Sequence, residues 1–126
     1  MERLIAAHLN AGDHNRFSYS VGYVNGEKDD LVPELEELGI EVHLLSAGSL
    51  PWPIALRQLV THGAYDIVHS HSPLVASAVR LATQTIRPAP ILFYTEHNSW
   101  DPYRRPTRWL NRATYRLDQV QFAVSN

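Results

Sequence analysis

The sequence predicts an α/β fold, a doubly wound parallel β-sheet that helices cover on both faces. Segments with helical periodicity and segments with strand-like periodicity alternate along the chain. The connections between the strand-like segments are long enough for the crossovers that parallel strands require. The chain of 126 residues has the length of one ordinary domain, so we expect a single domain over residues 1–126.

The spacing of apolar residues predicts the first elements. Residues 2–10 place apolar side chains at helical spacing, and residues 17–24 alternate with the period of two that is typical of a strand. Asp29 and Asp30 can cap a second helix, whose apolar stripe extends over residues 31–38.

The middle of the chain continues the alternation. Gly39 stands where a helix is expected to end, and residues 40–45 form the next predicted strand. The Gly, Ser and Pro content of residues 46–53 predicts a loop, which leads to a short helix over residues 54–60. Another strand is expected at residues 66–69.

The second half of the chain has the clearest helix signal. Ser72 is a suitable N-cap, a proline follows it, and apolar side chains continue at helical spacing as far as Ile86. Residues 91–95 have the continuous apolar character of a buried strand. After a loop, a helix is expected to open at Pro106, and residues 120–124 form the last predicted strand.

The composition excludes several classes of protein. Without cysteine, the chain contains no disulfide, no thiolate zinc site and no cysteine nucleophile. Eleven Lys and Arg residues against thirteen Asp and Glu residues give a net charge of −2, far from the basic surface of a nucleic-acid-binding protein. No apolar run reaches the roughly 18 residues of a membrane-spanning helix, and no signal-peptide pattern opens the chain. We therefore expect a soluble, cytoplasmic protein that binds no nucleic acid.

The order of the predicted elements also bears on domain organisation. The chain opens on a helix, whereas doubly wound domains usually open on a strand. We therefore expect an incomplete domain whose first strand lies outside residues 1–126. That strand normally occupies the middle of the sheet, so its absence is expected to leave a central gap.

Polar residues gather where three predicted strands end. Ligands of open parallel sheets bind at the carboxyl ends of the strands, where loops and helix N-termini converge. The candidate site residues here are His69, His71 and Ser72 after the first of these strands, Glu96, His97 and Asn98 after the second, and Ser125 after the third.

The histidines allow two interpretations. His69 and His71 are two residues apart at a strand end, so their side chains leave on the same side and can contact one sugar, phosphate or metal. A structural role, in which neighbouring backbone groups satisfy both rings, stays open. Zinc or iron would need at least three protein ligands, and the further candidates nearby are Glu96 and His97.

Glu96 and His97 are adjacent, so their side chains are expected to point to opposite faces of the strand. Only one of them should enter the crevice, and we expect it to be His97, an imidazole that can orient a hydroxyl and accept its proton. Ser72 is expected to cap its helix, and the capped N-terminus can at the same time bind an anion.

A stripe of arginines follows. Arg105, Arg108, Arg112 and Arg116 are spaced by three, four and four residues, which places them together on a helix beside apolar residues that include Trp109. Such a stripe fits an anionic membrane surface or a phosphorylated substrate. A solvated helix face is the favoured explanation, since arginine is a good exposed helix former.

Three segments resemble a known family when they are taken together. YDIVHSHSPLVASAVRLA at 65–82, LFYTEHNSW at 92–100 and TRWLNRATYRLDQVQFAVSN at 107–126 resemble the N-terminal domain of retaining glycosyltransferases of GT-B architecture, family 4. They occur in the order and spacing of that family, and the resemblance extends over essentially the whole chain.

The resemblance implies a Rossmann-like domain that binds the acceptor, which is a sugar, a lipid or another small molecule. A second domain, absent from this sequence, would bind the nucleotide-sugar donor, so residues 1–126 alone are expected to be inactive. Glu2 matches the glutamate of the glycine-rich turn of the family, and His71 with Ser72 matches its acceptor-side segment. His97 matches the catalytic histidine near the transferred sugar, and no metal or other cofactor is implied.

Two other classes of function stay open at this point. A metal-dependent hydrolase would use His69, His71 and His97 as ligands of zinc or iron. A non-catalytic sugar-binding domain would have the same crevice without turnover.

Overall fold

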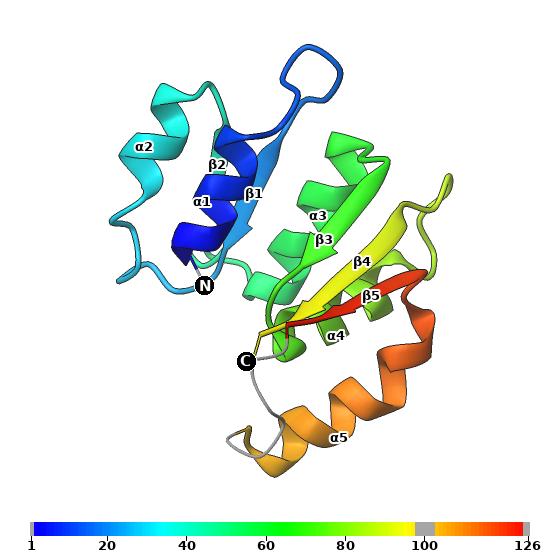
Figure 1. The fold of residues 1–126 in the computed structure, drawn as a ribbon. Helices are drawn as coiled ribbons and strands as arrows, with labels where there is room; N and C mark the ends of the chain where they lie inside the picture. Colours follow the sequence, from blue (N-terminus) through cyan, green and yellow to red (C-terminus); the bar gives the residue numbers. More distant parts are fainter. Residues whose placement is uncertain (1, 98–102, 125–126) are drawn as a thin grey trace. The chain divides into compact units, whose positions relative to one another are not determined.

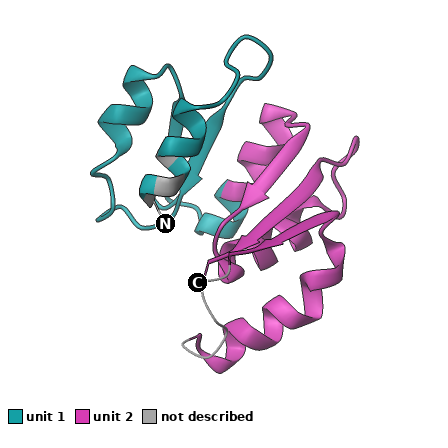
Figure 2. Ribbon diagram, in the orientation of Figure 1, with its two compact units in different colours: residues 1–55 teal, residues 56–126 magenta. Residues whose placement is uncertain are grey.

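The computed structural model of the chain describes residues 2–97 and 103–124. Helices and strands alternate along it (Figure 1). The elements are α1 (Glu2–Asn10), β1 (Ser20–Tyr23), α2 (Val32–Glu37), β2 (Glu41–Leu44), α3 (Trp52–Gly63), β3 (Ile67–Ser70), α4 (Pro73–Thr83), β4 (Ile91–Glu96), α5 (Arg105–Thr114), the 3₁₀ helix η1 (Tyr115–Leu117) and β5 (Val120–Ala123). The chain divides into two compact units, Met1–Ala55 and Leu56–Asn126 (Figure 2).

The first unit contains a parallel pair of strands, β1 and β2, whose register runs from Ser20 opposite Glu41 to Tyr23 opposite Leu44. Its core is built around three buried side chains, one from α1, one from α2 and one from the residue just before β2. These are Leu9, Leu35 and Ile40, with Ile5, Tyr19, Val21, Leu31, Leu38 and Val42 packed against them.

The end of α2 confirms the expected role of Gly39. This glycine has a φ of 75°, in the left-handed region that favours glycine. Its backbone N–H donates to the carbonyl of Glu36, and the N–H of Ile40 donates to the carbonyl of Leu35. These bonds satisfy carbonyls at the end of the helix, so the chain turns directly from α2 toward β2.

Two local predictions in this unit are wrong in detail. Residues 17–24 do not all form a strand, because a turn built on Asp13 continues as far as Phe17, whose N–H donates to the Asp13 carbonyl. The Asp13 side chain also accepts the N–H of Asn15, which favours the turn over an extended chain. The predicted aspartate cap is absent too, since α2 has Leu31 at its N-cap and no side-chain cap hydrogen bond.

The second unit contains the parallel sheet that positions the candidate site. Its strand order is β3-β4-β5, with Ile67 opposite Ile91 and Phe93 opposite Val120. The strands predicted at 66–69, 91–95 and 120–124 are therefore confirmed as parallel neighbours. The described strands form two sheets, one in each unit, and the expected first strand outside residues 1–126 stays a prediction.

Helices α4 and α5 pack on each other beside this sheet (Figure 1). Leu92 and Tyr94 of β4 face α4 and are buried, with 3% and 0% of their surface exposed. Ile67 and Phe122 belong to the opposite face, where they keep 46% and 49% of their surface exposed. Within the described residues, no helix is both long enough and apolar enough to cross a membrane.

Candidate functional site

The ends of β3 and β4 bring three histidines together. A ring nitrogen of His71, Nδ1, lies 3.0 Å from Nε2 of His97, and the two rings stack with centroids 5.3 Å apart. The rings of His69 and His71 have centroids 4.1 Å apart. We call these three residues the histidine stack.

The register of the sheet explains why the stack forms. His69 lies opposite Phe93, so each further step along β3 is matched by one along β4. Side chains two residues apart along a strand point to the same face of the sheet. His71 therefore follows His69 on the face that Phe93 occupies, and His97 lies on that same face at the carboxyl ends of the strands. His69 is fixed at the base of the stack, where its Nε2 lies 2.7 Å from the hydroxyl oxygen of Thr95.

The contact between His71 and His97 has a chemical consequence. A neutral imidazole has one N–H, so one ring donates the hydrogen bond and the other accepts it. A pair joined in this way can pass a proton from ring to ring and can orient a hydroxyl group brought beside it. Both properties are those of a general acid–base catalyst. The same pair can also bind a polar ligand without catalysis.

Glu96 lies on the other face of β4, as expected for a residue adjacent to His97. Its carboxylate accepts hydrogen bonds from the hydroxyl of Tyr94, at 2.5 Å, and from the hydroxyl of Tyr103, at 2.9 Å. Burial, and next the hydrogen bond to Glu96, raise the pKa of Tyr94, so this phenol stays a donor. The structure does not bring Glu96 together with the histidine stack, and its role as a substrate ligand stays a prediction.

A buried arginine supports this face of the sheet, and sequence reasoning missed it. The side chain of Arg80 in α4 is 0% exposed, and its Nε and Nη2 donate to the carboxylate of Asp118 at 2.6–3.0 Å. Its Nη1 donates to the side-chain oxygen of Asn111 at 2.7 Å and to the hydroxyl of Thr114 at 3.1 Å. The guanidinium also lies 4.9 Å from the ring centre of Tyr94.

These contacts tie α4 to α5 and to the segment that leads into β5. A buried charge is tolerated when its hydrogen bonds are satisfied, as they are here. The sequence contained one signal of this arrangement, because Arg80 falls on the same stripe of the helix as the apolar residues Ala76 and Val79. An arginine on a buried stripe needs a buried partner, which spacing alone does not identify.

The remaining predicted residues are placed as follows. Ser72 is the N-cap residue of α4, as expected, but its hydroxyl makes no capping hydrogen bond. The expected side-chain cap is therefore wrong, although the backbone carbonyl of Ser72 accepts the N–H of Ala76, as an N-cap carbonyl does. Glu2 begins α1 in the first unit, and its side chain lies outside the described part of the structure. Asn98 and Ser125 also lie outside it.

The metal-site interpretation finds no support in the side-chain arrangement. Among residues 2–97 and 103–124, no three His, Asp or Glu side chains are placed to hold one metal ion. In the histidine stack, the nitrogens that approach each other most closely are hydrogen-bonded to one another or to Thr95.

Comparisons with known proteins agree with the resemblance seen in the sequence. A family model described as a glycosyl transferase 4-like domain matches residues 3–126. The chain is 25% identical over 109 residues to the capsular polysaccharide biosynthesis glycosyltransferase CapH of Staphylococcus aureus. That match covers 85% of this chain and 31% of CapH, so the chain spans about a third of the relative's length. No solved structure matches the chain significantly.

Proposed function

This chain belongs to the glycosyl transferase 4-like domain family, and we propose that it forms the acceptor side of an enzyme that transfers a sugar from a nucleotide-sugar donor with retention at the anomeric carbon. Its Rossmann-like arrangement of parallel strands and helices agrees with that family. The observation that supports the proposal most directly is the 3.0 Å contact between His71 and His97 at the ends of two neighbouring strands.

We assign the contact with the reacting atoms to His97. In a retaining transfer, the bond between the anomeric carbon and the donor phosphate breaks, and the acceptor oxygen forms the new bond on the same face of the sugar. The acceptor proton passes to the departing phosphate. His97 would hydrogen-bond the attacking hydroxyl or the transferred sugar, and His71 fixes the orientation of the His97 ring.

The other predicted residues are proposed to bind the acceptor. His69 and Ser72 lie on either side of His71 in the chain, at the end of β3 and the start of α4. Glu2, Glu96, Asn98 and Ser125 complete the proposed substrate-binding set. The nucleotide-sugar would be bound by residues outside 1–126, so these residues alone would transfer no sugar, and the proposed reaction uses no metal or other cofactor.

We place the reaction in the cytoplasm, at the inner face of a membrane. The acceptor is then a sugar, a lipid or another small molecule that reaches the histidine stack from that side. The proposal includes no nucleic acid, in keeping with the net charge of −2.

The test is His97→Ala in the intact protein, assayed with a panel of nucleotide sugars. Turnover is expected to fall by about 10²–10⁴-fold, the usual contribution of a positioned acid–base group. Stability should change by about 1 kcal/mol or less, because His97 is partly exposed and leaves no large cavity. His62→Ala is the matched control, since His62 is an exposed histidine of α3 whose Nδ1 lies 2.8 Å from the Gln58 carbonyl of the same helix.

Two results would overturn the assignment. A His97→Ala protein that melts early but turns over normally while folded would give His97 a structural role. An intact protein that binds sugars but transfers none from any nucleotide sugar would favour a non-catalytic sugar-binding domain.

A further inference from the structure

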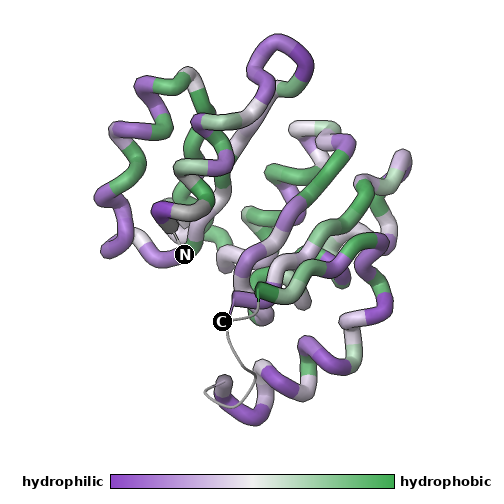
Figure 3. Tube along the Cα trace, in the orientation of Figure 1, coloured by the Kyte–Doolittle hydropathy of each residue, from purple (hydrophilic) through white to green (hydrophobic). Residues whose placement is uncertain are grey.

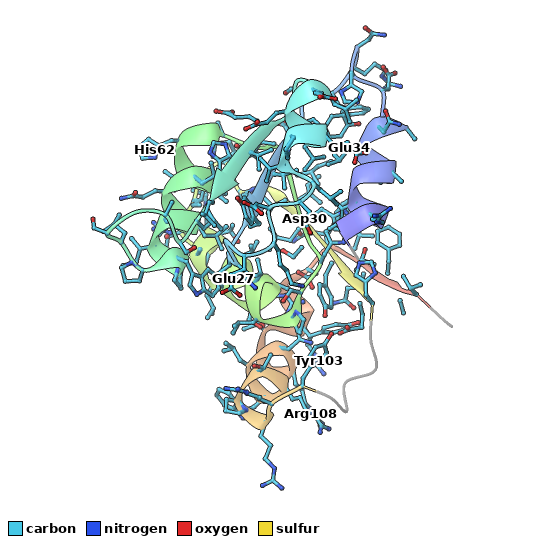
Figure 4. The ribbon with its side chains drawn as sticks, turned by 90° about the vertical axis from the view of Figure 1, so that its left-hand side faces the viewer. Glu27, Asp30, Glu34, His62, Tyr103 and Arg108 are labelled. Carbon is cyan, nitrogen blue, oxygen red and sulfur yellow. The ribbon has the colours of Figure 1, made fainter. Side chains whose placement is uncertain are left out.

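Helix α5 has two unlike faces. Asn111 and Thr114 are buried where α5 packs against α4, and both contact Arg80. The opposite face carries four arginines, all exposed, at positions 105, 108, 112 and 116, the last of them in η1. Figure 3 shows how hydrophilic α5 is beside the apolar strand β4, and Figure 4 shows Arg108 extending outward from the helix.

Trp109 lies in the middle of these arginines. It follows Arg105 by four residues and precedes Arg112 by three, so the three side chains share one face of the helix. Of its surface, 71% is exposed, more than for any other large apolar side chain described as exposed. We call Arg105, Arg108, Trp109, Arg112 and Arg116 the arginine face.

Within residues 103–124, no Asp or Glu side chain pairs with the arginine face. Between residues 102 and 117 the sequence has five arginines and no Asp or Glu. Among the described residues, the arginines of this face form no ion pair, and the buried pair of this region is Arg80 with Asp118. A chain with a net charge of −2 therefore concentrates positive charge on one exposed strip.

We propose that the arginine face binds the surface of an anionic phospholipid bilayer. This inference deepens the proposed location at a membrane and rests on that location, but it does not require the proposed reaction. Phospholipid headgroups supply many negative charges in one plane, and each arginine near such a surface adds to the affinity. Tryptophan is favoured at the boundary between headgroups and acyl chains, where an amphipathic ring can lie partly in each.

The length of the strip favours a membrane over a single phosphorylated ligand. Arg105 and Arg116 are eleven positions apart along α5 and η1, a span of about 16 Å at the usual helical rise per residue. One phosphate group can contact two or three arginines that converge on it, whereas these side chains spread along a helix. An exposed tryptophan among them adds nothing to phosphate binding, but it adds affinity at a lipid interface.

Vesicle binding by the intact protein tests the inference. The protein is mixed with vesicles of phosphatidylcholine alone, or with about a third phosphatidylglycerol, and the bound fraction is measured by sedimentation. Binding is expected only to the anionic vesicles and should weaken with added salt. Arg108→Gln with Arg112→Gln is expected to lower the affinity about 25-fold, at about fivefold for each charge removed.

Matched variants distinguish binding through the arginine face from an effect of the protein's net charge. Arg16→Gln with Arg87→Gln changes the net charge equally at exposed positions outside α5 and should bind almost as well as the unchanged protein. Trp109→Ala should weaken binding without lowering the melting temperature, because its side chain is 71% exposed. If the first double variant fails to fold, Arg105→Gln with Arg116→Gln tests the same face.

Several outcomes would overturn the inference. Equal binding to neutral vesicles, equal loss in both double variants, or tighter binding to a short RNA than to anionic vesicles would each do so. Transfer to a water-soluble acceptor is measured in parallel. Activity without vesicle binding rejects the lipid surface alone, and vesicle binding without any transfer rejects the proposed reaction alone.

Discussion

Strand β4 presents two faces of opposite character. Leu92 and Tyr94 point toward α4 and are almost completely buried. Phe93 and His97 point the other way, where Phe93 contacts His69 edge-on and His97 contacts His71. Because side chains alternate along a strand, β4 anchors the sheet on one side and places Phe93, and His97 just after its end, on the side of the histidine stack.

The difference between the two faces suggests that one face stabilises this unit and the other carries its function. On the helix side, the buried guanidinium of Arg80 and the carboxylate of Glu96 both have hydrogen-bond partners, and a buried polar group without one would cost free energy. On the histidine side, the rings are hydrogen-bonded but stay partly open to solvent. Substitutions on the helix side should therefore change mainly the free energy of unfolding, and substitutions in the histidine stack mainly the activity.

Arg80→Ala should give the largest loss of stability on the helix side. It leaves the buried carboxylate of Asp118 without its main partner, and breaking a buried ion pair in this way typically costs about 3–5 kcal/mol. His71→Ala, on the opposite side, should cost about 1 kcal/mol or less. Urea unfolding of both variants measures the two values, and similar losses would contradict the separation of roles.

A double variant sharpens this comparison. Arg80→Met with Asp118→Leu removes both charges and replaces them with apolar side chains of similar length. Such replacements are often neutral in stability, so the double variant should recover most of what Arg80→Ala loses. A double variant as unstable as Arg80→Ala would show that the contacts of Arg80 with Asn111 and Thr114 matter more than the ion pair.

Glu96→Gln should have an intermediate effect. The carboxylate accepts a hydroxyl proton on each of its oxygens, whereas the amide has one accepting oxygen, so one tyrosine loses its acceptor. The expected cost is about 1–3 kcal/mol. Turnover of the folded protein should also fall, because we propose that Glu96 binds the acceptor, and unchanged turnover would show that Glu96 is only a structural anchor. Glu36→Gln, at an exposed position of α2, is the matched control.

The sequence predicted the histidine side of β4 better than the helix side. Parallel strands end at a common edge and side chains alternate, so the sequence predicted that His71 and His97 lie near one edge of the sheet, although it did not predict the hydrogen bond between their rings. The pairing of Arg80 with Asp118 joins residues 38 positions apart. Its geometry depends on how α5 packs against α4, and no local pattern contains that information.

Helix caps show a second limit of sequence reasoning. Ser72 and the pair Asp29 and Asp30 are residue types that favour caps, yet neither α4 nor α2 has a side-chain cap hydrogen bond. A cap depends on the side-chain rotamer and on the path by which the chain enters the helix, and residue type specifies neither. Gly39 was predicted correctly, because its positive φ is a requirement that few other residues meet.

The smallest expected effect is on the response to high pH and is tested with Tyr94→Phe. At neutral pH the variant should lose about 1 kcal/mol, because Glu96 keeps its hydrogen bond from Tyr103. In the folded protein, burial raises the pKa of Tyr94 above its ordinary value, whereas in the unfolded chain the phenol ionises near pH 10. The folded state therefore holds more protons above that pH, and the stability that Tyr94 contributes is present below it and lost as the pH rises. Phenylalanine does not titrate, so the stability difference between the two proteins should shift in favour of the variant, by about 1.4 kcal/mol at one pH unit above the ordinary value, which is enough to close the gap. All other titratable groups are common to both proteins, so their contributions cancel in the difference in free energy of unfolding. If that difference stays constant from pH 8 to pH 11, Tyr94 ionises as freely in the folded protein as in the unfolded chain, and the prediction is wrong.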